Sequence, residues 1–290
     1  MAGNPTSVIV VMPDGTQVTY YPEAGVEPIP PPSAGGLDLR ADFAVVSPGP
    51  LTLANKCKMW GNLASTGRYG NGLWGPEGGP VLYDADPEGK YFSILGGGGK
   101  SGNNCLRLWY PAGEVGEQSK FYQVICGPLR ATVNLAFDML FEGGFNWWTD
   151  VGKVGPLIGW GGRSGADGGL TIFCVWQSGT SKSKGFNPII QNQQNPSEWG
   201  SNFIVPGIYT KKFVADQWYN WRWQVRCDGA AGEARVWLDG DELDIRTPDG
   251  FGNTSIADNI MLEHGFWFGG TAAPATDGWV RQDNLHFWTS

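Results

Sequence analysis

The chain has 290 residues, of which 41% are hydrophobic and 13% aromatic, and this is enough to bury the core of one large domain. Its formal net charge is −8 and its Lys and Arg residues are scattered, so nucleic acid is disfavoured as a partner. No run of about 18 apolar residues occurs, and the first residues lack the basic and apolar regions of a signal peptide. We therefore expect no membrane segment and no export by a signal peptide.

Residues 1–36 differ in composition from the rest of the chain. They hold seven of the 20 prolines and three acidic residues, without Lys or Arg. Residues 8–21 predict a β-hairpin that turns at Pro13, Asp14 and Gly15. A lone two-stranded hairpin is marginally stable in water, so we expect this N-terminal arm to dock on other copies or other proteins of a particle. The predicted organisation is an arm over residues 1–36 and one domain over residues 37–290.

From residue 37 onward, strand signals recur and helical periodicity is missing. In residues 131–141 and 218–227, apolar and polar side chains alternate, which is typical of strands with one buried face. The predicted buried positions are Val133, Leu135, Phe137, Met139, Phe141, Tyr219, Trp221, Trp223, Val225 and Cys227. Shorter strands are predicted over residues 106–110, 121–126, 170–177, 234–238, 261–268 and 279–288. Many short strands with turn signals between them predict an all-β fold, an antiparallel β-sandwich of the jelly-roll type.

Short motifs that often carry chemistry have simpler interpretations in this sequence. The segment Gly96–Ser101 has Ile94 where a phosphate-binding loop needs glycine, so a connection between strands is favoured. Residues 239–242 lack the full calcium-loop pattern and predict a hairpin turn instead. His264 and His286 each lie in an aromatic strand, which favours packed core side chains over catalytic groups. We therefore expect no metal and no cofactor.

Cysteines and carboxylates also argue against two classes of site. The five cysteines are odd in number and form no C-x-x-C pair, so we predict reduced residues that lie mostly in the core. They are Cys57, Cys105, Cys126, Cys174 and Cys227. The E-x-D-x-x-E spacing of jelly-roll retaining glycosidases does not occur anywhere in the chain. A hydrolase is therefore disfavoured.

Aromatic and cationic side chains indicate where a sugar could bind. Tryptophans in or beside Gly-rich or polar segments can stack on a sugar ring, and they are Trp60, Trp74, Trp147, Trp148, Trp160, Trp176 and Trp199. By alternation, Arg107 and Trp109 share one strand face, and Arg222, Gln224 and Arg226 share the polar face of another. These groups could hold an anionic sugar by charge-assisted hydrogen bonds and stacking. An ordinary solvated sheet face explains the same pattern.

A set of short segments carries a resemblance to a known family. The segments are residues 104–113, 137–141, 152–162, 218–225, 234–240, 268–270 and 283–285. In sequence order they resemble the landmarks of the alginate and glucuronan lyase group with a concanavalin A-like jelly roll. The resemblance implies two sheets, with a concave groove for an acidic polysaccharide on the face of Arg107 and Arg222. It also implies β-elimination, in which a lysine, tyrosine or histidine takes the proton beside a neutralised carboxylate.

Lys153 falls on the site lysine of that group, whereas other positions depart from the pattern. Thr171 and Phe173 stand where the group tends to carry Ser-x-Arg, and residues 188–190 read Pro-Ile-Ile where it tends to carry Tyr-x-Tyr. Phe in place of Arg removes charge neutralisation, and Ile in place of Tyr removes a proton donor. Each loss can raise the barrier by several kcal/mol. Three interpretations of Lys153 are then open. It is the one residue kept from a catalytic site that is otherwise lost, a lysine that contacts a sugar, or a solvated charge on a turn.

The sequence therefore leaves two functions open. We expect a non-catalytic surface protein of a larger assembly, a bacteriophage virion decoration or tail component, with a lectin-like polysaccharide-binding jelly roll at the virion surface. The alternative is a lyase that cleaves an acidic, uronate-containing polysaccharide, with Lys153 as the catalytic residue. The predicted carbohydrate-binding residues are Arg107, Trp109, Lys153, Trp160, Trp176, Trp199, Arg222, Gln224 and Arg226.

Overall fold

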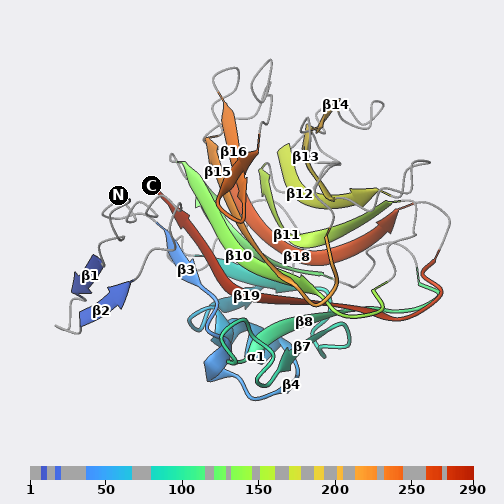
Figure 1. Cartoon of the computed structure of the whole chain (residues 1–290). Coiled ribbons are helices and arrows are strands. Elements are labelled where there is room, and N and C mark those ends of the chain that lie inside the picture. Colours follow the sequence, from blue (N-terminus) through green and yellow to red (C-terminus); the bar gives the residue numbers. More distant parts are fainter. Residues whose placement is uncertain are drawn as a thin grey trace, which may run out of the picture.

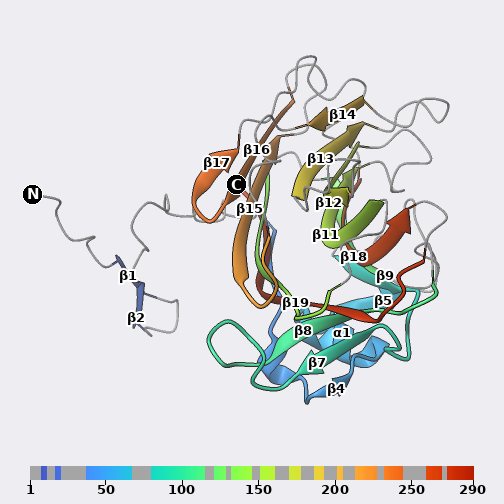
Figure 2. The ribbon, with the colours of Figure 1, turned by 45° about the vertical axis from the view of Figure 1, so that its right-hand side comes forward.

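The computed structural model describes residues 8–11, 17–20, 37–66, 80–114, 121–128, 132–145, 151–160, 170–177, 186–192, 201–204, 213–226, 232–243, 259–269 and 273–290. In residues 8–11, 17–20, 170–177, 186–192 and 201–204 this description covers the backbone only. In residues 151–160 and 259–269 it covers the backbone and a few side chains. Figure 1 shows two large β-sheets that form the body of the protein, and Figure 2 shows them after a turn about the vertical axis.

One sheet has nine strands and contains both predicted alternating segments. Its order is β17-β16-β15-β10-β19-β8-β7-β4, with β3 paired to β19. The strands are β3 (Asp38–Arg40), β4 (Gly49–Pro50), β7 (Phe92–Leu95), β8 (Cys105–Tyr110), β10 (Val133–Phe141), β15 (Trp218–Arg226), β16 (Glu233–Leu238), β17 (Asp241–Leu243) and β19 (Gly278–Thr289). We refer to it below as the nine-stranded sheet.

The second sheet has eight strands in the order β14-β13-β12-β11-β18-β9-β6-β5. The strands are β5 (Ala64–Thr66), β6 (Val81–Asp84), β9 (Phe121–Pro128), β11 (Val151–Trp160), β12 (Leu170–Gln177), β13 (Phe186–Asn192), β14 (Ser201–Ile204) and β18 (Asn259–Gly269). The β5–β6 pair is parallel, whereas the other neighbouring strands along this order pair antiparallel. We refer to it below as the eight-stranded sheet.

The hydrophobic core lies between the two sheets. The apolar positions of β10 and β15 pair directly, for example Phe137 with Trp221, whose rings stack with centroids 6.4 Å apart. Tyr122, Val124, Ile158 and Leu262 of the eight-stranded sheet belong to the same buried cluster. Each large apolar side chain buried in this way contributes about 1.5–3 kcal/mol. The all-β sandwich predicted from alternation is confirmed.

The ends of the predicted elements agree closely with the structure. The predicted strand over residues 170–177 has the same bounds as β12, and the predicted hairpin in the arm is present as β1 (Val8–Val11) paired with β2 (Gln17–Tyr20). The predicted turn after Leu238 joins β16 to β17, where Asp239 and Gly240 both have positive φ. Two positive φ values are what a two-residue hairpin turn requires. The docking of the arm and the boundary at residue 36 stay predictions.

The described residues also contain a short α-helix that strand periodicity did not predict. α1 (Leu53–Met59) follows the 3-10 helix η1 (Phe43–Val45), and Met59 and Trp60 at its end are buried. No helix in the described part of the chain is long and apolar enough to cross a membrane.

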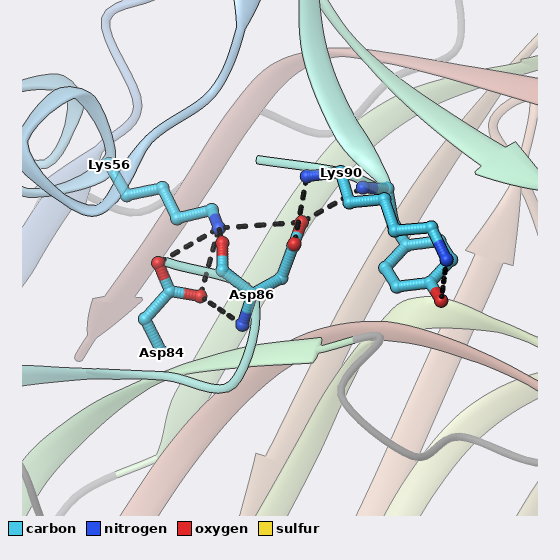
Figure 3. A network of polar contacts seen from close by, with 5 residues as sticks. Lys56, Asp84, Asp86 and Lys90 are labelled. Carbon is cyan, nitrogen blue, oxygen red and sulfur yellow. Dashed lines mark hydrogen bonds and ion pairs between the residues drawn. The ribbon is translucent and has the colours of Figure 1, made fainter. Parts of the chain in front are cut away.

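A buried ion pair fixes α1 to the strands beneath it. Lys56 is fully buried, and its Nζ lies 2.9 Å from both carboxylate oxygens of Asp84 and 2.6 Å from the backbone carbonyl oxygen of Asp86 (Figure 3). The Asp86 carboxylate in turn accepts from the backbone N–H groups of Lys90 and Tyr91. Burial lowers the pKa of Lys56, although the charge of Asp84 opposes that shift. The helix therefore depends on these charges being satisfied within the chain.

Candidate functional site

The predicted carbohydrate-binding residues fall on two different sheets. Arg107 and Trp109 lie on β8, and Arg222, Gln224 and Arg226 lie on β15, so these five belong to the nine-stranded sheet. Lys153, Trp160 and Trp176 lie instead on β11 and β12 of the eight-stranded sheet, and Trp199 lies outside the described residues. One groove on one sheet face therefore does not hold all of them, and their sugar-binding role stays a prediction.

Lys153 lies on an inner strand of the eight-stranded sheet. Its backbone is in register with Val175 of β12 on one side and with Trp267 of β18 on the other. Trp176 pairs with Gly152, so the backbone positions of Trp176 and Lys153 are next to each other across the β11–β12 ladder. Trp160 is the last residue of β11 and pairs with Ile260 of β18. By register, Lys153 shares its face of the sheet with Val175, and Trp176 falls on the opposite face, so one polymer on one face would not contact both.

The positions that depart from the lyase pattern are also brought together here. Phe173 of β12 is the direct backbone partner of Ile189 of β13, and Thr171 is the partner of Gln191. On its other side, Thr171 pairs with Gly159 of β11. Phe173 stands where the resemblance implies an arginine, and Ile190, where it implies a tyrosine, follows Ile189 on β13 and pairs with Ile172. Phe173 and Ile189 are 16 residues apart along the chain, and only the sheet register makes them neighbours.

On the nine-stranded sheet, Arg107 is already engaged by a carboxylate of the same chain. Its Nε and Nη2 lie 2.7 and 2.6 Å from the two carboxylate oxygens of Glu142, and its guanidinium lies over the ring of Trp279. Arg281 of β19 approaches the same carboxylate, with its Nε at 2.8 Å. Burial alone would raise the pKa of Glu142, but hydrogen bonds and charge from Arg107 and Arg281 lower it below its usual value. An anionic sugar at Arg107 would have to compete with this carboxylate.

The three predicted residues of β15 are also in contact with neighbouring strands. Arg222 lies on the predicted polar face of β15. It is nevertheless only 8% exposed, because its guanidinium lies 4.8 Å from the ring of Trp237. Gln224 donates to the side-chain oxygen of Asn134, and Arg226 lies 3.9 Å from the carboxylate of Glu233. The alternation identified the correct face. The alternative of an ordinary solvated face does not hold for Arg222, because cross-strand stacking covers it.

Asp138 is a further acidic residue on this face, and no motif in the sequence pointed to it. Its carboxylate is 3% exposed and accepts from Lys100 and Asn220 at 3.0 Å and from Asn284 at 2.7 Å. Lys100 belongs to the segment Gly96–Ser101, which joins β7 to β8 as a connection between strands. The loop is also held by Asp283, which accepts from the backbone N–H of Lys100. The glycine-rich segment thus packs on the sheet through carboxylates, where a phosphate would be repelled.

Lys56, Asp84 and Asp86 are residue types that are common in catalytic sites, but a substrate has no access to this cluster. The side chains are 0%, 1% and 5% exposed, so a polymer cannot reach them. His286 is likewise packed, at 7% exposed, and its Nε2 lies 2.6 Å from the carboxylate of Asp38. The side chains of three of the five cysteines, Cys57, Cys105 and Cys126, are described, and each is free. Among the described residues, no group of His, Cys, Asp and Glu has the arrangement of a metal site.

The fold has counterparts among solved structures, while no protein-family model and no curated protein matches the chain. Alginate lyase Aly36B, solved as a mutant in complex with an alginate trisaccharide, is similar with a TM-score of 0.65 at 18% identity. That similarity covers 87% of this chain and 98% of the lyase chain. Alginate lyase vAL-1 from Chlorella virus is similar with a TM-score of 0.53 at 12% identity, over 69% and 89% of the two chains. The fold is that of the jelly-roll polysaccharide lyases.

This result confirms the family resemblance of residues 100–290 at the level of the fold, and it extends the likeness toward the N-terminal part of the chain. The strands β4 to β7, which follow η1 and precede residue 100, belong to the same two sheets. At 18% identity the likeness is one of backbone shape, and the side chains at the site must be considered on their own.

Proposed function

We propose that this protein binds an acidic, uronate-containing polysaccharide on its eight-stranded sheet and cleaves it by β-elimination. The single observation that carries the proposal is the combination of a lyase-like fold over 87% of the chain with Lys153 on inner strand β11. The resemblance through residues 152–162 singles out the same lysine by its place in the sequence. An alginate lyase of nearly the same extent is known with a trisaccharide of alginate bound.

The ion pairs on the nine-stranded sheet support this location. On the nine-stranded sheet, Arg107 is paired with Glu142, Arg226 is close to Glu233, and Arg235 forms a two-point pair with Glu242. A sugar carboxylate could replace these partners only by leaving protein carboxylates unpaired, which costs free energy. The eight-stranded sheet is therefore the better surface for the substrate.

In the proposed reaction, Lys153 takes the proton from the ring carbon that bears the carboxylate. The electron pair of that C–H bond forms a double bond to the adjacent carbon, and the glycosidic oxygen on that carbon leaves and takes up a proton from water. A lysine can act as this base when its neutral form is populated, which a partly desolvated site favours. The reaction needs no redox change and no added nucleophile.

A second function is favoured by the apolar residues Phe173 and Ile190. They lie on the paired strands β12 and β13 where the resemblance implies an arginine and a tyrosine, so charge neutralisation and proton donation are both missing from these positions. A sheet that keeps aromatic residues but lacks these groups can bind a polysaccharide without cleaving it. This second candidate is a non-catalytic, lectin-like jelly roll. For this second candidate, the role at a virion surface and the contacts of residues 1–36 with a particle remain predictions.

The deciding experiment is incubation of the full chain with alginate, with glucuronan and with host capsular polysaccharide. Absorbance in the ultraviolet band of unsaturated uronic ends reports cleavage, and retention in polysaccharide-containing gels reports binding. We expect new absorbance with at least one polymer, its loss in Lys153→Ala, and retained binding in that variant. Lys58→Ala, at an exposed position of α1, is the matched control and should keep full activity.

Each outcome separates the candidates. Binding without absorbance, unaffected by Lys153→Ala, rejects the lyase and supports the lectin-like function. Absorbance that persists in Lys153→Ala rejects the assignment of the base. If the protein neither binds nor cleaves any of the three polymers, the carbohydrate function is wrong.

A further inference from the structure

Gln282 is a buried amide that links the two sheets through the core. It lies on β19, in register with Leu106 of β8 and Met139 of β10, and all three side chains are fully buried. Its side-chain Nε2 donates a hydrogen bond to the backbone carbonyl oxygen of Gly155, which belongs to β11 of the opposite sheet. A polar group in such apolar surroundings is costly unless it is bonded, so its presence needs a reason.

The bond reaches β11 at an irregular point of that strand. The ladder between β11 and β12 is regular from Val151 to Val154, then shifts register and resumes at Ile158. Gly155 and Pro156, at the shift, are both buried. A buried backbone carbonyl that leaves the ladder must find another donor. Gln282 supplies that donor from across the core.

The irregular point is next to the residue that the proposed reaction depends on. Gly155 comes two residues after Lys153, which lies in the last regular stretch before the shift. The hydrogen bond from Gln282 therefore fixes the distance between β11 and β19 just after Lys153 and Val154. The side-chain oxygen of Gln282, Oε1, has no hydrogen-bond partner within the described residues. The amide is therefore placed to hold the Gly155 carbonyl rather than to satisfy all of its own polar atoms.

We propose that Gln282 is a positioning residue: its amide holds the Gly155 carbonyl and so fixes β11 in the register that presents Lys153 to the polysaccharide. This inference rests on the proposed function. Gln282 does not contact the substrate, because it lies inside the core between the sheets. It acts through the backbone of β11, in which a displacement of about 1 Å can cost about 100-fold in rate.

The test is Gln282→Met in the full chain, because methionine fills the space of glutamine but donates no hydrogen bond. We expect kcat on the cleaved polyuronate to fall about 10- to 100-fold, while KM stays within about threefold. The melting temperature should fall only modestly, because the Gly155 carbonyl loses its donor while the unpaired Oε1 is removed as well. Amide hydrogen exchange should become faster in residues 151–154 of β11 but not in residues 105–110 of β8.

Asn104→Leu is the matched control, because the Asn104 amide donates to the backbone carbonyls of Phe43 and Val46 and does not reach β11. It should leave kcat and β11 exchange unchanged. An unchanged kcat in Gln282→Met overturns the proposal, as does a loss of kcat with exchange that rises equally in β8 and β11. A wild-type chain that releases no unsaturated product overturns the proposed function instead. In that case hydrogen exchange still tests the inference. If the exchange of β11 amides is unchanged in Gln282→Met, Gln282 does not position β11.

Discussion

Arg107 and Glu142 form a two-point ion pair, with the guanidinium Nε and Nη2 at 2.7 and 2.6 Å from the two carboxylate oxygens. Arg107 lies on β8, and Glu142 directly follows β10, so the pair spans the intervening strand β19. Arg281 of β19 lies between them and approaches the same carboxylate. The three side chains thus join three adjacent strands on the face of the nine-stranded sheet that points away from the core.

Glu142→Gln should reduce stability at neutral pH and flatten its acid dependence. The folded pKa of Glu142 is lowered, so its contribution is present above its ordinary value of 4.5 and is lost as the pH falls through the folded pKa. We expect a cost of about 1–3 kcal/mol at pH 7, measured by urea unfolding followed by tryptophan fluorescence. The exposed residue Glu88 provides the control variant Glu88→Gln, which should be neutral. Equal acid dependence in the wild type and in Glu142→Gln would contradict this account.

Lys56→Met should be strongly destabilising, whereas Lys58→Met on the same helix should be nearly neutral. Lys56 is fully buried and paired with Asp84, so its removal leaves a carboxylate without its counter-charge in the core. We expect a loss of about 3–5 kcal/mol in the free energy of unfolding, against under about 0.5 kcal/mol for Lys58→Met. The double variant Lys56→Met/Asp84→Asn should recover part of the loss, because the uncompensated charge is then gone. A double variant as unstable as Lys56→Met would refute the role of the charge.

His286 should make the protein less stable under mildly acidic conditions. Burial lowers the pKa of His286, the charge of Arg40 lowers it further, and the hydrogen bond to Asp38 opposes both effects. The unfolded chain therefore binds a proton at a higher pH than the folded one. The stability of the folded state is full above about pH 6.5 and decreases as the pH falls toward the folded pKa.

His286→Gln should remove this part of the pH dependence while it keeps a hydrogen-bonding group near Asp38. The measurement is the free energy of unfolding in urea at several pH values between about 7.5 and about 5.5, a range that brackets the ordinary histidine pKa. Wild type should lose more stability over this range than His286→Gln, because the other titrating groups are shared. Parallel curves would show that His286 does not titrate differently in the folded and unfolded states.

The sequence by itself was sufficient for the local features of the fold. Alternation in residues 131–141 and 218–227 identified the buried faces of β10 and β15, because successive side chains of a strand point to opposite sides. The turn at Asp239 and Gly240 was also predictable, since few residues accept positive φ. Lys153 was found through a short segment whose order along the chain matches a known group. Each of these signals lies within about a dozen neighbouring residues and needs no knowledge of the partner strand.

Only the tertiary structure decided which strands lie side by side, and this changed the view of the site. Arg107, Arg222 and Lys153 all looked like candidates for one groove, but β11 belongs to one sheet and β8 and β15 belong to the other. The pairing of Phe173 with Ile189, the engagement of Arg107 by Glu142 and the bond from Gln282 to Gly155 were equally hidden. Strand order and register arise from contacts between residues that are distant along the chain, and those contacts are selected by the packing of the whole core.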